Sequence, residues 1–130
     1  MDTSFKAVIL DSANRVLLGF NRRGEWELLG GRAEPQDNTP EETIRREVQE
    51  EAGLAIDIFE LLDIWYYDIP TRGRVAVASY RASVVGGQQL TRGDEHDDVA
   101  FFDVKKLDRL PLPDGYRKSI RLAAAARAGK

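Results

Sequence analysis

The stretch TPEETIRREVQEEAG, residues 39–53, carries a complete set of signals for one helix. Thr39 is a good N-cap, Pro40 suits the first helical position, and Glu42 stands three residues after the cap, as in a capping box. Gly53 is a good helix stop. These signals predict a helix of about three and a half turns.

The two faces of this helix differ in chemistry. Three apolar residues at helical spacing form a stripe that should face the protein body: Ile44, Val48 and Ala52. Glu47, Glu50 and Glu51 lie at i, i+3 and i+4 on the neighbouring face, with Glu51 almost beside the stripe. Carboxylates placed so closely repel one another unless a cation joins them, and hard divalent cations prefer oxygen ligands. The alternative is a solvated acidic face on which Arg45 and Arg46 pair locally.

Strand patterns surround the helix. Extended segments are predicted at 5–10, 15–20, 26–29, 54–69, 75–85 and 99–104. The first two flank a turn-like sequence and are expected to form a hairpin. A second helix is expected from Asp114, as its cap, to Ala128, with Tyr116, Ile120 and Ala123 on one stripe. Strands outnumber helices and the helices are separated, which predicts an α+β or mixed-sheet sandwich.

Composition limits the function classes. The 130 residues, 42% hydrophobic and 32% charged, show no repeat or linker and are interpreted as one domain spanning 1–130. A net charge of -3 argues against a sequence-independent grip on nucleic acid. No apolar run approaches the roughly 20 residues of a membrane span, and the first residues do not resemble a signal peptide. A cytoplasmic location is therefore expected.

The absence of cysteine excludes disulfide frameworks, thiolate metal sites and cysteine nucleophiles. A single histidine, His96, excludes a site that needs two. Any chemistry is therefore expected to depend on the 22 carboxylates.

Two stretches together resemble the Nudix hydrolase family: WELLGGRAE, residues 26–34, and REVQEEAGL, residues 46–54. The family signature is a loop–helix–loop with the pattern GX5EX7REUXEEXGU, where U is a bulky aliphatic residue. REVQEEAGL matches the second half at every position, and Gly31 supplies the opening glycine. The resemblance implies the Nudix fold, an α/β/α sandwich with a central mixed β-sheet and the Nudix loop–helix–loop.

The chain departs from this signature at one place. The segment from Gly31 to Arg46 is one residue longer than the pattern, and Gln36-Asp37-Asn38 stands where the family usually has Gly-Glu. Asp37 is the nearest acidic substitute, which leaves the role of the loop carboxylate open. The helix carboxylates keep their register.

The resemblance implies Mg²⁺-dependent hydrolysis, with Mn²⁺ as a substitute, of a pyrophosphate bond in a nucleoside diphosphate linked to another moiety, of the ADP-ribose or nucleotide-sugar type. The alternatives are a nucleoside triphosphate pyrophosphohydrolase of the MutT housecleaning type and a non-catalytic Nudix-fold nucleotide-binding module. Such modules usually lose box carboxylates, which this chain keeps. The expected partner is a small-molecule nucleotide, with neither nucleic acid nor membrane, and a homodimer is a further expectation.

By the same resemblance, the expected metal ligands are Glu47, Glu50, Glu51 and the carbonyl of Gly30. Glu47 and Glu50 are also expected to be catalytic, together with Glu95 from the loop at 91–98 and with Arg46, which would orient the helix carboxylates. An ordinary surface salt bridge is the alternative for Arg46.

Three further expectations concern the second loop and the substrate. Asp98 competes with Glu95 for the second-loop role, and His96 is a weaker candidate for phosphate contact or base.

Arg22, Arg23 and Arg32 are candidates to meet phosphates. Four aromatic residues are candidates to stack on a base, with Tyr66 preferred: Phe20, Trp65, Tyr66 and Tyr67. The segment 107–115 resembles a loop that the family places near the substrate.

Overall fold

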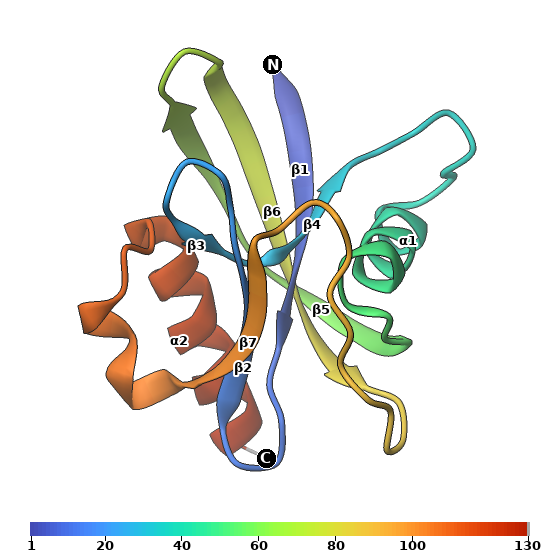
Figure 1. Cartoon of the computed structure of the whole chain (residues 1–130), viewed down its shortest axis with the longest axis vertical. Helices are drawn as coiled ribbons and strands as arrows, with labels where there is room; N and C mark the ends of the chain where they lie inside the picture. Colours follow the sequence, from blue (N-terminus) through green and yellow to red (C-terminus); the bar gives the residue numbers. More distant parts are fainter. Residues whose placement is uncertain (130) are drawn as a thin grey trace.

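The computed structural model describes residues 1–129 (Figure 1). Its strands and helices follow in chain order: β1 (Asp2–Ile9), β2 (Arg15–Phe20), β3 (Trp26–Glu27), β4 (Leu29–Arg32), α1 (Pro40–Ala52), β5 (Ile56–Ile69), β6 (Gly73–Val84), β7 (Asp98–Asp103), a 3-10 helix (Val104–Arg109) and α2 (Asp114–Ala128). Within the described residues, no helix has the length and apolar character needed to cross a membrane.

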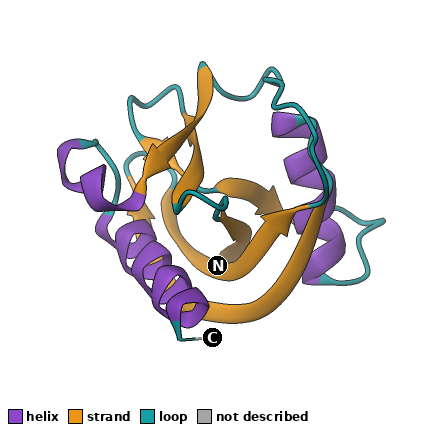
Figure 2. Ribbon diagram, turned by 90° about the horizontal axis from the view of Figure 1, so that it is seen from below, coloured by secondary structure: helices purple, strands orange, loops and turns teal. Residues whose placement is uncertain are grey.

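The strands form two sheets between two helices. The larger sheet has the order β4-β1-β6-β5, in which β1 and β6 run parallel and the other neighbours run antiparallel. The smaller sheet has the order β3-β2-β7 and is antiparallel. α1 and α2 lie on opposite sides of the strands (Figure 2). The predicted α+β sandwich with a mixed central sheet is confirmed.

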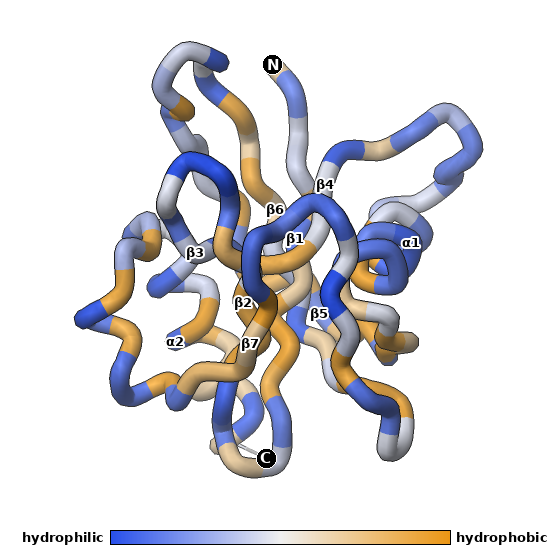
Figure 3. The backbone as a smooth tube through the Cα atoms, viewed as in Figure 1, coloured by the Kyte–Doolittle hydropathy of each residue, from blue (hydrophilic) through white to orange (hydrophobic). Residues whose placement is uncertain are grey.

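Side chains that alternate along β1 supply two separate cores. Ala7 and Ile9 pack in one core with Ile44 and Val48 of α1. Val8 packs in the other core, on the side of α2. The predicted apolar stripe of α1 is confirmed, and Figure 3 shows the contrast between the hydrophobic inner strands and the hydrophilic loop that precedes β7.

The ends of α1 follow the sequence signals. The Thr39 hydroxyl accepts a hydrogen bond from the backbone N–H of Glu42 at 3.1 Å, and Pro40 occupies the first turn. The Glu42 carboxylate accepts from the N–H of Asn38 at 3.1 Å, one residue earlier than in a standard capping box. Gly53 ends the helix with φ 66, a left-handed conformation that costs glycine little.

The predicted hairpin of the first two strands is wrong. β1 and β2 belong to different sheets and are joined by a single antiparallel bridge between Leu10 and Val16. Both edges of β1 are already occupied, by β4 and β6. The turn after β1 therefore passes the chain to the second sheet.

Two further details differ from expectation. Pro113, and not Asp114, stands at the N-cap of α2, and the cap position makes no side-chain hydrogen bond. The Asp114 carboxylate accepts instead from Arg117 Nη1 at 2.8 Å. The 3-10 helix was not predicted. The long predicted strand is present as β5, and its pairing with β6 is interrupted by register shifts between Ile58 and Asp63.

Candidate active site

Three carboxylates from two segments meet at one end of α1. Glu47 and Glu50 project from the helix, and Glu95 comes from the loop before β7. One oxygen from each lies within 4.8 Å of the other two. This set, called the carboxylate cluster below, offers the hard oxygen ligands that Mg²⁺ and Mn²⁺ prefer.

Glu51 lies beside the cluster but is hydrogen-bonded to strand β4. Its side chain is buried, and its Oε1 accepts the backbone N–H of Gly30 at 3.0 Å. Burial raises the pKa of Glu51, and a hydrogen bond with Glu95 raises it further. The geometry therefore gives Glu51 a contact that holds Gly30 of β4 next to the cluster.

The cluster is electrostatically unfavourable without a cation. Burial raises the pKa of Glu47, and the charge of Glu95 adds to this rise, while Arg46 opposes it. A divalent cation favours the deprotonated form of its ligands, so binding would reverse these shifts. The residues present thus fit a divalent metal ion.

Arg46 connects the cluster to the loop before α1. Its Nη1 donates to Glu47 at 3.1 Å and to Glu50 at 3.5 Å. On the other side its Nη2 donates to Asp37 Oδ2 at 2.8 Å and its Nε donates to Oδ1 at 3.3 Å. The same Asp37 carboxylate accepts the N–H of Glu34 at 2.9 Å. Arg46 therefore does more than form a surface salt bridge, because Asp37 holds its guanidinium on one side and Glu47 and Glu50 hold it on the other.

The loop that carries Glu95 is anchored on the last turn of α1. The N–H of Gly93 donates to the carbonyl of Glu51 at 3.0 Å, and the N–H of Thr91 donates to that of Ala52 at 2.9 Å. These carbonyls end the helix and otherwise lack helical partners. A Cβ at Gly93 would lie 2.1 Å from the Glu50 carbonyl oxygen, so only glycine permits this approach.

The other side of the loop is anchored on the small sheet. His96 is buried, and its Nε2 lies 2.9 Å from Oε2 of Glu27. Arg22 Nη2 donates to the carbonyl of Asp94 at 2.9 Å. Asp98 points elsewhere, since its carboxylate accepts the N–H of its neighbour Val99 at 2.9 Å. The structure thus brings Glu95, and not Asp98, to the helix carboxylates.

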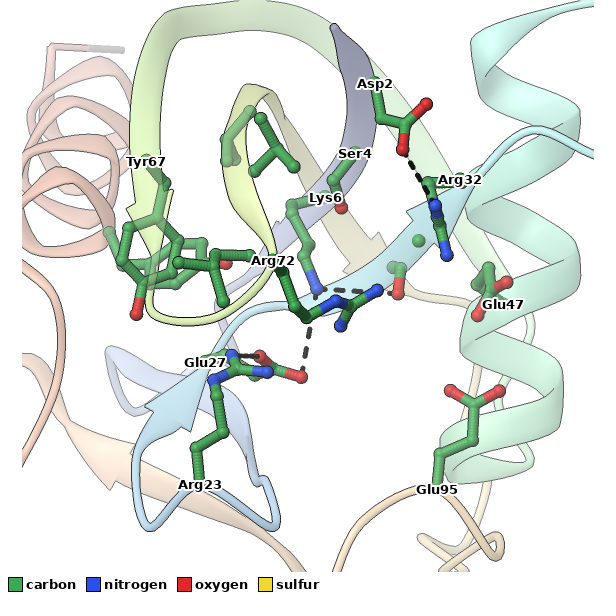
Figure 4. Close-up of a pocket in the computed structure, with 16 residues that line it drawn as sticks. Asp2, Ser4, Lys6, Arg23, Glu27, Arg32, Glu47, Tyr67, Arg72 and Glu95 are labelled. Atoms are coloured by element: carbon green, nitrogen blue, oxygen red, sulfur yellow. Dashed lines mark hydrogen bonds and ion pairs between the residues drawn. The ribbon is translucent and has the colours of Figure 1, made fainter.

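A cavity of about 420 Å³ opens beside the cluster (Figure 4). Glu47 and Glu95 border one side of it and Tyr67 the opposite side, and Tyr116 also lines it. Further lining residues are mostly charged or polar: Asp2, Ser4, Lys6, Arg23, Glu27, Arg32 and Arg72. The cluster therefore faces a space with room for a polar, charged ligand.

The NUDIX domain model matches residues 2–123. The chain belongs to the Nudix family. A relative from Methanocaldococcus jannaschii named ADP-ribose pyrophosphatase is 33% identical over 107 residues, which cover 78% of this chain and 62% of the relative. A MutT-like protein from Streptomyces ambofaciens is 41% identical over 80 residues, 60% of this chain and 49% of the relative. The Nudix chain thus spans about half to two thirds of these relatives.

Solved structures share the fold. The NUDIX domain of Shewanella oneidensis NrtR, solved in complex with ADP ribose, superposes with a TM-score of 0.80 at 21% identity, covering 98% of this chain and 88% of that chain. The β-sandwich and the loop–helix–loop described above are therefore those of a Nudix domain.

Only some of the predicted substrate residues line the cavity. Arg23 and Arg32 line the cavity, whereas Arg22 is engaged with the Glu95 loop. Tyr66 is exposed on the other face of β5, with the Arg74 guanidinium 5.4 Å from its ring, and its neighbour Tyr67 lines the cavity instead. Successive side chains of a strand point to opposite faces, so only one of the two tyrosines can face the cavity.

The remaining aromatic candidates pack against other rings. Trp65 contacts Tyr116 at 5.1 Å between centroids, and Phe20 contacts Trp26 at 5.0 Å. The segment 107–115 contributes no lining residue to the cavity within the described chain. The sequence-based search missed Lys6 and Glu27, although a lysine inside the apolar strand FKAVIL was the visible signal for Lys6.

Proposed function

We propose that this Nudix chain is a Mg²⁺-dependent hydrolase that cleaves a pyrophosphate bond in a nucleoside diphosphate linked to another moiety, of the ADP-ribose or nucleotide-sugar type. The observation that carries the proposal is the carboxylate cluster, whose oxygens lie within 4.8 Å of one another at the border of a polar cavity. The name of the Methanocaldococcus jannaschii relative and the ADP ribose bound by the Shewanella oneidensis domain support this substrate class.

In this proposal the metal ligands are Glu47, Glu50 and Glu95. Glu51, which accepts the Gly30 N–H, and the Gly30 carbonyl, which accepts from Lys6 Nζ at 3.5 Å, stay candidates for further oxygen ligands. The bound ion would supply charge neutralisation at the phosphate oxygens and a more acidic water. Glu95 reaches the cluster from the loop before β7 and is the preferred base, with Glu47 as the alternative.

Arg46 acts through the carboxylates in this proposal. Its bonds to Glu47 and Glu50 restrict their rotamers, and Asp37 fixes its guanidinium. Pre-orientation of this kind reduces the ordering needed when the ion and the substrate bind.

Substrate phosphates are expected to meet Arg23 and Arg32, which line the cavity. Arg32 is paired with Asp2 at 2.9 Å at the rim, and Arg23 lies 3.4 Å from Glu27. Tyr67 replaces Tyr66 as the aromatic candidate for the rest of the substrate, because it lines the side of the cavity opposite the cluster.

The second candidate is hydrolysis of a nucleoside triphosphate, which the MutT-like relative favours. The cluster serves both reactions, because both need a metal ion at a phosphoanhydride. A non-catalytic nucleotide-binding module is less well supported, since Glu47, Glu50 and Glu95 are retained and gathered.

Four further statements remain predictions: one Nudix domain over 1–130, a cytoplasmic location, a homodimer, and a small nucleotide as partner rather than nucleic acid or membrane. Sedimentation of the purified chain with and without a nucleotide tests the homodimer.

The test of the function is a substrate panel. About a dozen nucleotides, including ADP-ribose, nucleotide sugars, dinucleoside polyphosphates and nucleoside triphosphates, are incubated with the chain and Mg²⁺, and released nucleoside monophosphate and pyrophosphate are quantified. Nucleoside monophosphate from ADP-ribose or a nucleotide sugar is expected. Pyrophosphate from triphosphates alone would favour the second candidate, and tight binding without turnover would favour the binding module.

A further inference from the structure

Lys6 is a buried cation in the middle of β1. It is 6% exposed, and its side chain reaches the cavity between the cluster and the tyrosines (Figure 4). Its Nζ lies 3.5 Å from the Gly30 carbonyl oxygen and 4.0 Å from Oε2 of Glu27. An ammonium has three donors, and both of these contacts are long, so donor capacity remains on the cavity side.

The ammonium keeps its charge in this position. Burial alone would lower the pKa of Lys6, but Glu27 and the other nearby acidic groups raise it above its usual range. Glu47 and Glu51 are among those groups, so the ammonium lies within the field of the helix carboxylates. A fixed positive charge therefore stands next to the proposed metal site.

Glu27 does not require Lys6 as its hydrogen-bond partner. His96 Nε2 lies 2.9 Å from Oε2 of Glu27, and Asn21 Nδ2 donates to Oε1 at 3.0 Å. Arg23 Nη2 reaches the same oxygen at 3.4 Å. These contacts are all shorter than the one from Lys6. The lysine charge is thus available to a group in the cavity.

Arg72 faces the same space. It belongs to the turn between β5 and β6 and lines the same cavity as Lys6 (Figure 4). Within residues 1–129, its guanidinium has no hydrogen-bond or ion-pair partner, whereas the rim residue Arg32 is paired with Asp2. Two cations with unused donors therefore line the same cavity.

We propose that Lys6, with Arg72, forms an anion subsite that holds the substrate phosphate on the cavity side of the carboxylate cluster. The inference rests on the proposed function, because it assigns a place to the second phosphate of a pyrophosphate whose first phosphate is at the metal site. Two adjacent phosphates carry more charge than one ion neutralises, and fixed ammonium and guanidinium groups are suited to the remainder.

The test measures binding rather than turnover. Methylenediphosphonate, which cannot be hydrolysed at its bridge, is titrated calorimetrically into the chain in the presence of Mg²⁺. Lys6→Met is expected to weaken its binding at least about tenfold, because a charge-assisted contact is lost. Arg72→Met is expected to weaken it several-fold, and Lys6→Arg to retain most of it. Lys118→Met is the matched control, since Lys118 pairs with Asp63 at 3.7 Å on the surface, and it should bind as the parent does.

A double variant separates phosphate binding from a structural role. Lys6→Met removes the buried cation beside Glu27, which keeps its ion pair with Arg23, and is expected to lower the Tm, whereas Lys6→Met/Glu27→Gln removes both charges of the Lys6–Glu27 pair. Recovery of the Tm without recovery of diphosphonate binding supports the subsite. Recovery of both would overturn it, and so would unchanged binding by Lys6→Met. If Lys6→Met alone does not fold, diphosphonate binding is measured on the double variant instead.

The outcome is separable from that of the proposed function. Diphosphonate binding that depends on Lys6, in a chain that cleaves no nucleotide of the panel, upholds the subsite and contradicts the hydrolase. Nucleotide cleavage that is insensitive to Lys6→Met, with unchanged diphosphonate affinity, upholds the hydrolase and contradicts the subsite. No detectable diphosphonate binding by the parent chain with Mg²⁺ also contradicts the subsite.

Discussion

Asp37 and Arg46 form a two-point pair, with Nη2 at 2.8 Å from Oδ2 and Nε at 3.3 Å from Oδ1. They join the loop before α1 to the face of α1 that carries the carboxylates, across the place where the chain is one residue longer than the Nudix pattern. The acidic residue displaced by the extra residue therefore still contacts the arginine of the signature. This pair links the irregular loop to the geometry of Glu47 and Glu50.

Asp37→Ala is expected to lower activity about ten- to hundredfold, because groups that orient metal ligands typically have effects of this size. The Mg²⁺ concentration needed for half-maximal rate should rise in parallel. Glu34→Gln is the control, since Glu34 contacts Arg46 at 3.2 Å but its side chain is half exposed. An Asp37→Ala variant with parental kinetics would show that Arg46 needs no support from the loop.

Glu50→Gln and Glu51→Gln are each expected to lower kcat at least about a hundredfold, roughly 2.7 kcal/mol of transition-state stabilisation, with the fold intact. Glutamine keeps an oxygen that can accept the Gly30 N–H. Glu51→Gln therefore tests the charge of the side chain and not its hydrogen bond to Gly30. Steady-state kinetics and circular dichroism check both points. Parental turnover in either variant would contradict the metal-site interpretation.

Glu95→Gln is expected to lower kcat while KM stays within a few fold, because a base acts more in the transition state than in ground-state binding. Asp98→Asn is the matched control, since its carboxylate contacts the Val99 N–H and lies outside the cluster. The reverse pattern, with loss in Asp98→Asn and none in Glu95→Gln, would assign the second-loop role to Asp98.

The metal-free chain should lose stability as the pH rises from 5 to 9. Burial and Glu95 place the pKa of Glu51 at about 10, far above the value of about 4.3 for an unfolded chain. The folded state then holds a proton that the unfolded state has released, so raising the pH favours unfolding by up to about 1.4 kcal/mol per pH unit. The pKa of Glu27, about 2, and that of Lys6, above its usual range, lie outside this window.

Thermal unfolding in chelator across this pH range measures the effect. Glu51→Gln should reduce the decline in Tm, because one of the two carboxylates with a raised pKa, Glu51 and Glu47, is removed. Saturating Mg²⁺ should also raise the Tm most at high pH, where the ligands are already deprotonated. A Tm that is independent of pH in chelator would show that Glu51 ionises normally in the folded chain.

The sequence predicted α1 in detail because its signals are local. Thr39, Pro40 and Gly53 specify the two ends through bonds within a few residues, and the stripe of Ile44 and Val48 specifies the buried face. The match of REVQEEAGL to the family pattern then predicted which helix residues belong to the site. The family resemblance also predicted Glu95, in the loop at 91–98, as a site residue.

The sequence did not predict features that depend on distant partners. The turn-like sequence of residues 11–14 is compatible both with a β1–β2 hairpin and with a turn that joins two sheets. The second outcome occurs because β4 and β6 already pair with both edges of β1. The choice between Tyr66 and Tyr67 depends on strand phase, which the register shifts in β5 obscure. Glu27 becomes informative only when the folded chain shows that it lines the same cavity as Lys6.

The most direct test of the central claim is the rate of nucleotide hydrolysis as a function of free Mg²⁺, measured with the substrate of the panel that is cleaved fastest. The cluster of Glu47, Glu50 and Glu95 predicts no turnover in excess EDTA, saturable recovery as Mg²⁺ or Mn²⁺ is added, and no such recovery in Glu50→Gln at the same ion concentrations. Full turnover in EDTA, or a parental Mg²⁺ response in Glu50→Gln, would contradict the claim that these carboxylates hold the catalytic metal ion.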